Sequence, residues 1–266
     1  MEIKTLKDTS LEIIHASFIK AFSDYQEPME MSLESFVAMM ERYSLDLSLS
    51  VGAFIDESLV SFILVGRRGN RVYDAGTATI REFRRQKIAS KLFKYQMQIL
   101  SKNDISEYIL ECIDTNEKAM NLYESKGFSI IRHLDCYRVS KIEAEDMEIE
   151  EAPLQDAAEI EEAMLYKPSW QNSYQSYKND DSFHLYKVGK TSVVVSERGV
   201  VSLINAEDID SCIAILSHAL KQSKTGGLRI INIDRENKQI KKLMVKIGAE
   251  LFVSQVEMNL FLNQSS

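Results

Sequence analysis

The sequence lacks the residue patterns that mark metal centres, disulfide frameworks, secreted proteins and membrane proteins. Its 266 residues include three cysteines and four histidines, and none of them has the close spacing of a metal site or a redox motif. An odd number of cysteines favours a reduced, cytoplasmic setting, and we expect no bound metal. No apolar run approaches the roughly 20 residues that a membrane span requires, and the N-terminus lacks the apolar segment of a secretion signal. We therefore expect neither secretion nor membrane insertion.

An excess of basic residues is also missing. Thirty-two basic and 40 acidic side chains leave a net charge of −8, which disfavours nucleic acid or an anionic membrane as a partner and is compatible with a cationic substrate. The hydrophobic content of 45% can build a core, and the length is enough for one large or two medium domains. This composition is that of an ordinary soluble enzyme.

The most informative segment is a short basic loop between a predicted strand and a predicted helix. Residues 75–80 alternate small, β-branched and apolar side chains as a strand would, and apolar residues recur at helical spacing from Ile88 onward. Between them, residues 84–87 contribute three cationic side chains. Because the first turn of a helix exposes unpaired N–H groups and about half a positive charge, this segment predicts a pyrophosphate site.

A second strand and helix are predicted directly afterwards. Residues 108–113 form a mostly apolar strand, and the pattern Asn116-x-x-Ala119-x-x-Leu122-Tyr123-x-x-x-Gly127-Phe128 follows it. Asp114 and Glu117 have the spacing of a capping box at the start of this helix. Gly127 fits the left-handed residue after the helix end, and Phe128 can fold back onto the last turn.

In this order, the two patterns resemble motifs A and B of the GCN5-related N-acetyltransferases (GNAT family). Arg84 and Ala89 match the first and last positions of the family's pyrophosphate loop, whereas Lys87 replaces its middle glycine, which would allow a positive φ. The resemblance covers about residues 1–140. It implies an α/β (α+β) fold with a mixed, mostly antiparallel sheet flanked by helices. It also implies acetyl-CoA as co-substrate, and direct transfer of its acetyl group to a primary amine of a small molecule or peptide.

The resemblance also assigns residues to the co-substrate. Tyr123 would protonate the sulfur of coenzyme A, Asn116 would bind the pantetheine arm, and the backbone groups of Thr77 and Thr79 would bind it as well. Asn116 and Tyr123 are seven residues apart, which is about two helical turns, so they project from a similar face. The alternatives are a core aromatic for Tyr123 and a helix cap for Asn116. The phosphates would bind the loop and the helix start, formed by Arg84, Arg85, Gln86, Lys87, Ile88, Ala89 and Ser90.

Further candidates lie around the strand that precedes the second helix. Glu111 stands where some members of the family carry a general base, and desolvation on an apolar strand would raise its pKa toward neutrality. The alternative is a solvated or ion-paired glutamate. For the substrate, the candidates are Asp24, Tyr25 and Tyr73, with Asp74 beside the last; exposed acids and tyrosines more often simply face water.

The second half of the chain repeats the first at a shift of 121 residues. Asn237-x-x-Ile240-x-x-Leu243-Met244-x-x-x-Gly248-Ala249 has the spacing of the second pattern, and Ile209 falls on Ile88. The sequence therefore predicts two tandem GNAT-like domains, a catalytic one at residues 1–142 and a second one at residues 147–266.

The second copy has lost the predicted chemistry. Under the same shift, the loop residues become Asn205, Ala206, Glu207 and Asp208, so that the local charge changes from +3 to −2. Acidic residues at a helix N-terminus stabilise the helix, so this loop has the composition of a cap rather than an anion site. Met244 replaces Tyr123 and cannot donate a proton. We expect this domain to bind no cofactor.

Two interpretations stay open at this point. The segment around Trp170 could wall the substrate pocket, although packing between elements is the more common role of a tryptophan. In place of an enzyme, the chain could be a non-catalytic module that senses coenzyme A or serves as a scaffold. A nucleic-acid-binding protein is disfavoured by the charge and by the lack of a basic motif with aromatic residues.

Overall fold

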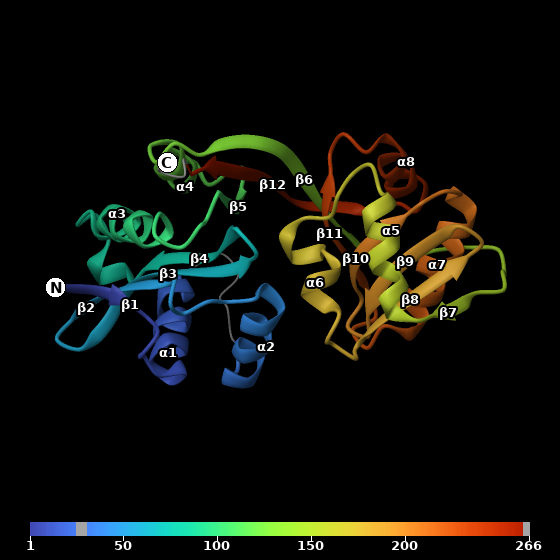
Figure 1. Ribbon diagram of the computed structural model, residues 1–266. Coiled ribbons are helices and arrows are strands. Elements are labelled where there is room, and N and C mark those ends of the chain that lie inside the picture. The colour runs from blue at the N-terminus through green and yellow to red at the C-terminus, as the bar shows by residue number, and fades with distance from the viewer. Residues whose placement is uncertain (25–30, 263–266) are drawn as a thin grey trace. The chain divides into compact units, whose positions relative to one another are not determined.

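A computed structural model describes residues 1–24 and 31–262 and divides the chain into two compact units. Unit 1 comprises Met1–Glu111, Asn121–Ser129 and the C-terminal residues from Met258, and unit 2 comprises Cys112–Met120 and Ile130–Glu257. Each unit is built on strands with helices packed against them, as Figure 1 shows. The units are therefore not two continuous stretches of chain.

The first half of the chain contains the elements that build the predicted cofactor site. In order, they are β1 (Glu2–Thr5), α1 (Leu11–Phe22), α2 (Leu33–Tyr43), β2 (Val51–Ile55), β3 (Ser58–Arg68), β4 (Arg71–Thr79), the 3-10 turn η1 (Arg81–Phe83), α3 (Ile88–Leu100), β5 (Glu107–Ile113) and α4 (Glu117–Glu124).

The second half repeats this order with shorter first helices. After β6 (Ser129–Val139), which ends the first copy, its elements are β7 (Glu150–Ala152), η2 (Leu154–Asp156), α5 (Ala157–Ala163), η3 (Trp170–Asn172), α6 (Tyr174–Tyr177), β8 (Phe183–Val188), β9 (Thr191–Ser196), β10 (Val200–Asn205), α7 (Ile209–Gln222), β11 (Leu228–Asp234), α8 (Lys238–Lys246) and β12 (Glu250–Phe261).

In unit 1, β1 to β4 pair antiparallel in chain order, and β5 pairs parallel to β4. The helices α1 and α2 cover one face of this sheet and α3 covers the other (Figure 1). Ile14, Phe18 and Ala21 recur at helical spacing on α1 and are buried. The ring of Phe18 lies 5.2 Å from that of Phe36 on α2 and 5.9 Å from that of Phe62 on β3. An aromatic core thus holds the two helices against the sheet.

Unit 2 repeats this topology, with β7 to β10 antiparallel and β11 parallel to β10. The first residues of α7, β11, α8 and β12 each lie 121 positions after those of α3, β5, α4 and β6. The predicted repeat is therefore confirmed, as is the prediction of mixed, mostly antiparallel sheets flanked by helices.

The helices α4 and α8 begin in the same way in the two copies, and α4 ends as the sequence predicts. The side chain of Asn116 accepts a hydrogen bond from Ala119 N–H, and that of Asn237 accepts one from Ile240 N–H. Because α4 begins at Glu117, its cap is Asn116, and the predicted capping box with Asp114 is wrong. Gly127 has a φ of 93°, and Phe128 N–H donates to the carbonyl of Tyr123, which confirms the predicted helix end.

The last strand of the chain completes the sheet of unit 1. Residues from Met258 onward belong to that unit, where Leu262 N–H donates to the carbonyl of Ser106 at 2.9 Å. The side-chain amide of Asn259 donates to Glu107 on β5 at 3.1 Å. The strand β6 directly follows α4, yet it pairs with β11 of unit 2, with Val139 opposite Leu228. The strand beside β5 is therefore supplied by the end of the chain.

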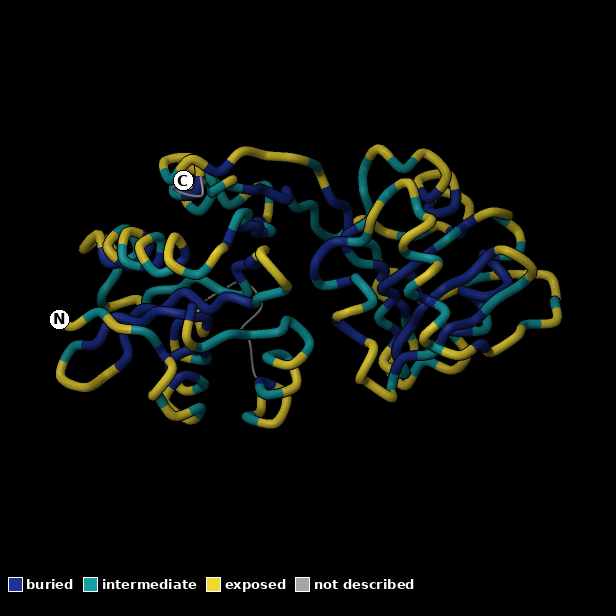
Figure 2. The backbone as a smooth tube through the Cα atoms, viewed as in Figure 1, coloured by how far each residue is buried: buried dark blue, intermediate teal, exposed yellow. Residues whose placement is uncertain are grey.

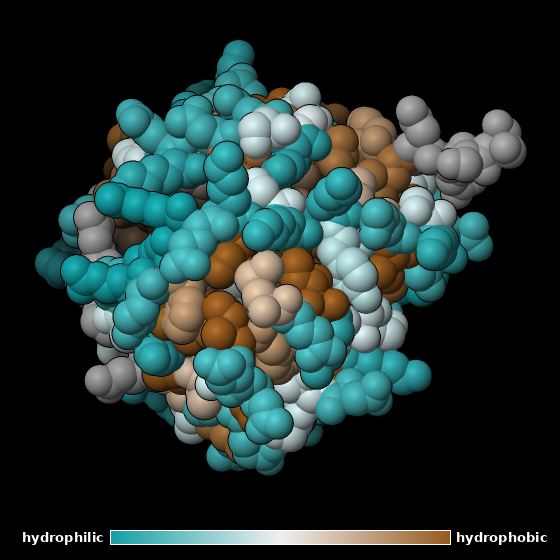
Figure 3. All heavy atoms as spheres, turned by 90° about the vertical axis from the view of Figure 1, so that its left-hand side faces the viewer, coloured by the Kyte–Doolittle hydropathy of each residue, from teal (hydrophilic) through white to brown (hydrophobic). Residues whose placement is uncertain are grey.

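The central strands of both sheets are buried, as Figure 2 shows, with β9 buried along its whole length. All three cysteines are buried, and none of them forms a disulfide. On the face drawn in Figure 3, hydrophilic side chains predominate and hydrophobic ones form small areas between them. Over residues 1–24 and 31–262, no helix is long and apolar enough to span a membrane.

Candidate active site

The candidate site of unit 1 lies where two parallel strands stop pairing. β4 and β5 pair through Arg71–Glu107, Val72–Tyr108 and Tyr73–Ile109. Beyond these pairs, β4 runs on to Thr79 and β5 to Ile113, and the pairing of β4 with β3 shifts register next to Asp74. Such irregularities redirect the side chains near them. The continuation of β4 leads directly into the basic loop.

The basic loop adopts the backbone conformation that glycine would favour, although it contains no glycine. Arg85 has a φ of 63°, and Lys87, the residue before α3, has φ 58° and ψ 22°. Arg84 has a φ of −67°, so the sign of φ changes along the loop. A backbone that alternates in this way turns its N–H groups toward one side and forms an anion-binding concavity. Lys87 thus adopts a left-handed backbone, at a conformational cost of about 1–2 kcal/mol for an L-residue.

The side chains of residues 85–87 are exposed, whereas Ile88 is buried and anchors the start of α3. The first N–H groups of a helix have no partner within the helix, and here they belong to Ile88, Ala89 and Ser90. Positive charge, an open helix N-terminus and a concave backbone therefore coincide at one place. This combination fits the phosphates of a nucleotide.

Arg84, the first residue of the basic loop, binds Asp24. The two side chains form a two-point ion pair, and the Arg84 guanidinium lowers the pKa of the Asp24 carboxyl. Two of the predicted site residues, one expected at the cofactor and one at the substrate, are therefore brought together with each other. Tyr25 lies outside the described residues.

Tyr123 projects from α4 into the interior of unit 1. Its ring lies 5.9 Å from that of Phe93 on α3 and 5.7 Å from that of Phe128. Its hydroxyl donates a hydrogen bond of 3.3 Å to Oδ2 of Asp74, which follows the last paired residue of β4. Tyr123 is thus both a core aromatic, as the alternative interpretation predicts, and a hydroxyl held at the divergence of the two strands.

Asp74 is a buried carboxyl group of this site with a raised pKa. It is 7% exposed, and burial raises its pKa to about 6 against the opposing effect of its hydrogen bonds. Next to it on β4, the hydroxyl of Thr77 donates to Asp74, and the hydroxyl of Thr79 bonds with that of Ser61. The carbonyl of Thr79 accepts from Nε of Arg84 at 2.8 Å.

Sequence reasoning missed two residues beneath Asp74. The hydroxyl of Tyr108 donates to Gln96 on α3 at 2.9 Å, and the amide of Gln96 donates to the carbonyl of Leu49 at 3.2 Å. Burial raises the pKa of Tyr108, and the charge of Asp74 adds to this effect. The sequence pattern that could have indicated Gln96 is its position on the apolar face of α3, four residues after Leu92 and four before Leu100.

Glu111 and Tyr73 lie near a tyrosine that sequence reasoning did not single out. Tyr43, at the end of α2, has its ring 6.0 Å from that of Tyr73. Burial raises the pKa of Tyr43, Arg42 opposes this shift, and Glu111 adds to it. Glu111 is half-buried on β5, and Tyr73 is buried. Tyr73, a substrate candidate, and Glu111, the candidate general base, thus share Tyr43 as a neighbour.

Unit 2 lacks the loop of unit 1. Residues 80–87 separate β4 from α3, whereas only residues 206–208 separate β10 from α7. The side chain of Asp208 accepts a hydrogen bond of 2.8 Å from Ser211 N–H, and this bond lowers the pKa of Asp208. The predicted structural cap is therefore confirmed. The second copy differs from the first by a deletion as well as by its charge.

In unit 2, a side chain of the protein binds the strand edge at the point where β10 and β11 stop pairing. β10 and β11 pair through Val200–Arg229 and Val201–Ile230. At the next residue of β11, the carbonyl of Ile231 accepts a hydrogen bond of 2.6 Å from the side chain of Asn172, which is buried. Trp170 on the same short turn is also buried, as the packing interpretation predicts.

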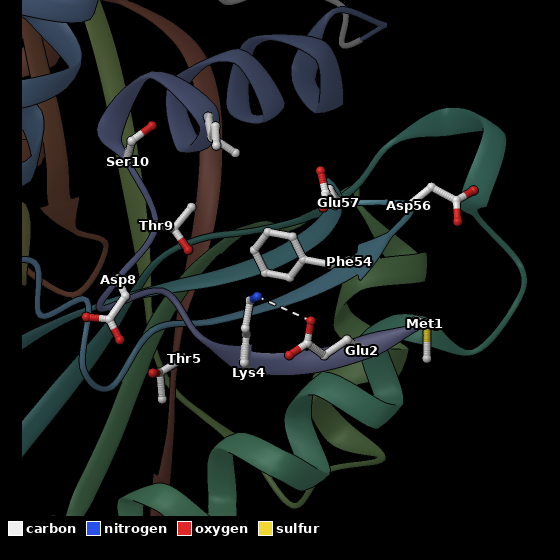
Figure 4. A pocket seen from close by; sticks show the side chains of 11 residues that line it. Met1, Glu2, Lys4, Thr5, Asp8, Thr9, Ser10, Phe54, Asp56 and Glu57 are labelled. Atoms are coloured by element: carbon white, nitrogen blue, oxygen red, sulfur yellow. Dashed lines mark hydrogen bonds and ion pairs between the residues drawn. The ribbon is translucent and has the colours of Figure 1, made fainter.

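A pocket of about 650 Å³ lies elsewhere in unit 1, beside β1, the start of α1 and the turn after β2 (Figure 4). In Figure 4, Lys4 pairs with Glu2, and its ammonium lies 4.5 Å from the ring centre of Phe54. None of the predicted site residues lines it. In the described part of the chain, no group of three or more His, Cys, Asp or Glu residues is placed to hold a metal ion.

Residues 11–128 match the model of the acetyltransferase (GNAT) family. Among curated proteins, the chain is 32% identical over 89 residues to N-alpha-acetyltransferase 30 of Dictyostelium discoideum, a match that covers 32% of this chain and 48% of that protein. The chain thus spans about half the length of the curated relatives it matches.

Solved structures match over the whole chain. A protein from Pyrococcus horikoshii has a TM-score of 0.75 at 17% identity, covering 100% of this chain and 91% of its own. A tandem GNAT protein from the clavulanic acid biosynthesis pathway has a TM-score of 0.67 at 11% identity, covering 100% of this chain and 99% of its own. Residues 11–128 thus match the GCN5-related N-acetyltransferase (GNAT) family, and the repeated topology and these likenesses show that the chain has the fold of two GNAT-like units in tandem.

Proposed function

We propose that unit 1 transfers the acetyl group of acetyl-CoA directly to a primary amine. The observation that carries this proposal is the hydroxyl of Tyr123 at the divergence of β4 and β5, 3.3 Å from Asp74. An acyl transfer needs a proton for the departing thiolate, and this hydroxyl binds Asp74 on β4, the strand that leads into the basic loop. Unit 2 has methionine in place of this tyrosine and only a short, acidic connection in place of the loop.

The residues of the loop would hold the phosphates of the co-substrate. Arg85 and Lys87 are exposed and cationic, and the N–H groups of residues 85–90 include the open end of α3. Arg84 contributes by fixing the loop rather than by direct contact, since Asp24 neutralises it. The backbone of Thr77 and Thr79 stays the proposed partner of the pantetheine arm, whereas the side-chain oxygen of Asn116 caps α4, as the alternative interpretation predicts.

The amine would approach from the side of β5. We assign Glu111 as the general base that accepts the amine's proton through water, and Tyr123 as the general acid that protonates the sulfur. Tyr73 and Tyr43 would border the amine, because their rings lie next to each other and Tyr43 is close to Glu111. The net charge of −8 suits a cationic amine. Since the curated relatives are named N-alpha-acetyltransferases, the α-amine of a peptide is the first substrate to test.

Thiol release from acetyl-CoA tests this proposal. The purified chain is offered peptides, amino acids, polyamines and aminoglycosides, and free thiol is measured for each. Tyr123→Phe should slow the release by about 10²-fold, which is typical for the loss of a general acid. Tyr166→Phe in unit 2, which removes the hydroxyl of a different tyrosine, is the matched control. If acetyl-CoA binds but no amine reacts, the chain is instead a coenzyme A sensor or scaffold.

A further inference from the structure

Asp74 is a buried carboxyl group that the proposed mechanism does not yet use. Its Oδ1 accepts a hydrogen bond from Gly76 N–H at 2.9 Å, and its Oδ2 accepts one from the hydroxyl of Thr77 at 2.6 Å. The third partner is Tyr123, at 3.3 Å from Oδ2. A carboxyl group that shares a hydrogen bond with a general acid can exchange a proton with it.

The groups around Asp74 are neutral at ordinary pH. β4 itself contributes the Thr77 hydroxyl and the Gly76 N–H, and α4 contributes Tyr123. β5 contributes Tyr108, whose hydroxyl is bound to Gln96 of α3, and β3 places Val65 opposite Asp74. Burial outweighs the three donors, and the pKa of Asp74 is about 6. A fraction of the protein therefore carries Asp74 as a carboxylic acid near neutral pH.

The charge of Asp74 decides whether Tyr123 can act as an acid. When Tyr123 gives up its proton, negative charge develops on the phenol oxygen. A carboxylate at 3.3 Å would repel that charge in a buried site, whereas a carboxylic acid would remove it by donating a proton. The carboxylate that then forms on Asp74 already has the Thr77 and Gly76 donors to stabilise it.

We propose that Asp74 in its acid form passes a proton to the oxygen of Tyr123 while Tyr123 passes its own proton to the departing sulfur. This rests on the proposed acetyl transfer. The amine nitrogen forms a C–N bond to the acetyl carbon, the C–S bond breaks with its electron pair left on sulfur, and that pair takes the Tyr123 proton. Asp74 is left as a carboxylate and recovers a proton from solvent, which has received the one lost by the amine. Because Asp74 acts through Tyr123, it is a positioning residue and proton donor to the catalytic one.

The test compares the pH dependence of kcat/KM for acetyl-CoA in the wild type and in Asp74→Asn, with the same amine. Asparagine keeps the size of the side chain and accepts from Gly76 but cannot give up a proton. We expect the wild type to lose activity as pH rises through about 6, and the variant to lack this step. The variant's kcat should fall by about tenfold or more, with KM for acetyl-CoA unchanged within about twofold.

Three further variants separate a relay from a structural role. Thr77→Val removes a donor to the carboxylate and should move the alkaline decline to higher pH, and Thr77→Ser should restore it. Asp74→Asn should cost little more in a Tyr123→Phe background, because the two residues act in one step. The relay is overturned if the alkaline decline of kcat/KM persists in Asp74→Asn, or if the losses of activity of the two single variants multiply in the double variant. Either result leaves the proposed acetyl transfer intact. A wild type that releases no thiol with any amine overturns both.

Discussion

The guanidinium of Arg84 holds the carboxylate of Asp24 at two points, with Nη1 to Oδ2 at 2.6 Å and Nη2 to Oδ1 at 2.7 Å. The same guanidinium donates to the carbonyls of Thr79 and Ala21. The first residue of the basic loop is therefore tied to the end of α1 and to the end of β4. This arrangement makes the shape of the loop depend on a residue sixty positions earlier in the chain.

Asp24→Asn should weaken the binding of acetyl-CoA. The neutral amide cannot form the ion pair, so the free loop is less ordered. Binding acetyl-CoA must then order the loop, which costs part of the binding free energy. We expect KM for acetyl-CoA to rise by about three- to tenfold, with a smaller change in kcat. The control is Glu82→Gln, which removes the exposed Lys20–Glu82 ion pair between the same two parts of unit 1. Equal effects of the two variants on KM would contradict a special role of Asp24.

Lys87 carries a second prediction, because it has a left-handed backbone without being glycine. Lys87→Gly should raise the free energy of unfolding by about 1 kcal/mol, since glycine adopts this conformation without steric cost. Lys87→Ala is the matched variant, because it removes the same charge and keeps the strain. Urea unfolding gives the stabilities, and calorimetry gives the affinity for acetyl-CoA. If alanine stabilises as much as glycine, the backbone is not strained at this position.

The chain should bind one equivalent of acetyl-CoA. Unit 2 has three residues in place of the eight that form the loop region of unit 1, and Asn172 bonds to the edge of β11 where its strands diverge. Calorimetric titration should give a stoichiometry of about one. Reversing charge in unit 1 with Lys87→Glu should weaken this binding by at least about tenfold, and Asp208→Lys in unit 2 should add no second site. A wild-type stoichiometry of two would contradict the loss of the site in unit 2.

The sequence predicted the parts of the fold that depend on local patterns. The second copy, the helix ends at Gly127 and Gly248, and the cap at Asp208 follow from spacing and residue type, and the structure confirms them. The ungapped shift aligns α7 with α3 but by itself does not show where the preceding strand ends.

Contacts between distant parts of the chain were beyond the sequence. Nothing local indicates that Arg84 pairs with Asp24, or that Tyr123 reaches Asp74, because the sheet brings these residues together. The roles of these residues in acetyl transfer, and the boundaries at residues 142 and 147, stay predictions. The strand that completes unit 1 is a further example, since residues from Met258 onward contact β5 although they are more than a hundred positions away in the sequence.

Removing the chain from Met258 onward should therefore destabilise unit 1. The deletion exposes the edge of β5 and removes the bonds to Ser106 and Glu107. Asn259→Ala removes only the bond to Glu107 and should lower the free energy of unfolding by about 1 kcal/mol. Phe261→Ala, at a side chain that is 71% exposed, should change it by less than about 0.5 kcal/mol. Hydrogen exchange localises the effect, and unchanged protection of β5 in the deletion would contradict this role of the strand.

Asp74 should lower the stability of the folded protein at neutral pH. Its pKa is raised from 3.8 to about 6 in the fold, so between these values the folded state holds the proton more tightly than the unfolded state does. The free energy of unfolding therefore falls as pH rises through this window, by about 2–3 kcal/mol in total, and is flat above it. Asp74→Asn lacks this titration and should be more stable than the wild type at pH 8 but not below pH 4.

Asp24 should have the opposite effect on the pH dependence of stability, and it serves as the control. Its pKa is lowered by Arg84, so its contribution is present above the pKa of the unfolded chain and is lost as pH falls. Asp24→Asn should therefore destabilise the protein at neutral pH and converge with the wild type in acid. Urea unfolding between pH 3 and pH 8 measures both variants. An Asp74→Asn variant that is less stable than the wild type at pH 8 would mean that the Asp74 carboxylate stabilises the fold. This result would contradict the prediction that burial of its charge lowers the free energy of unfolding.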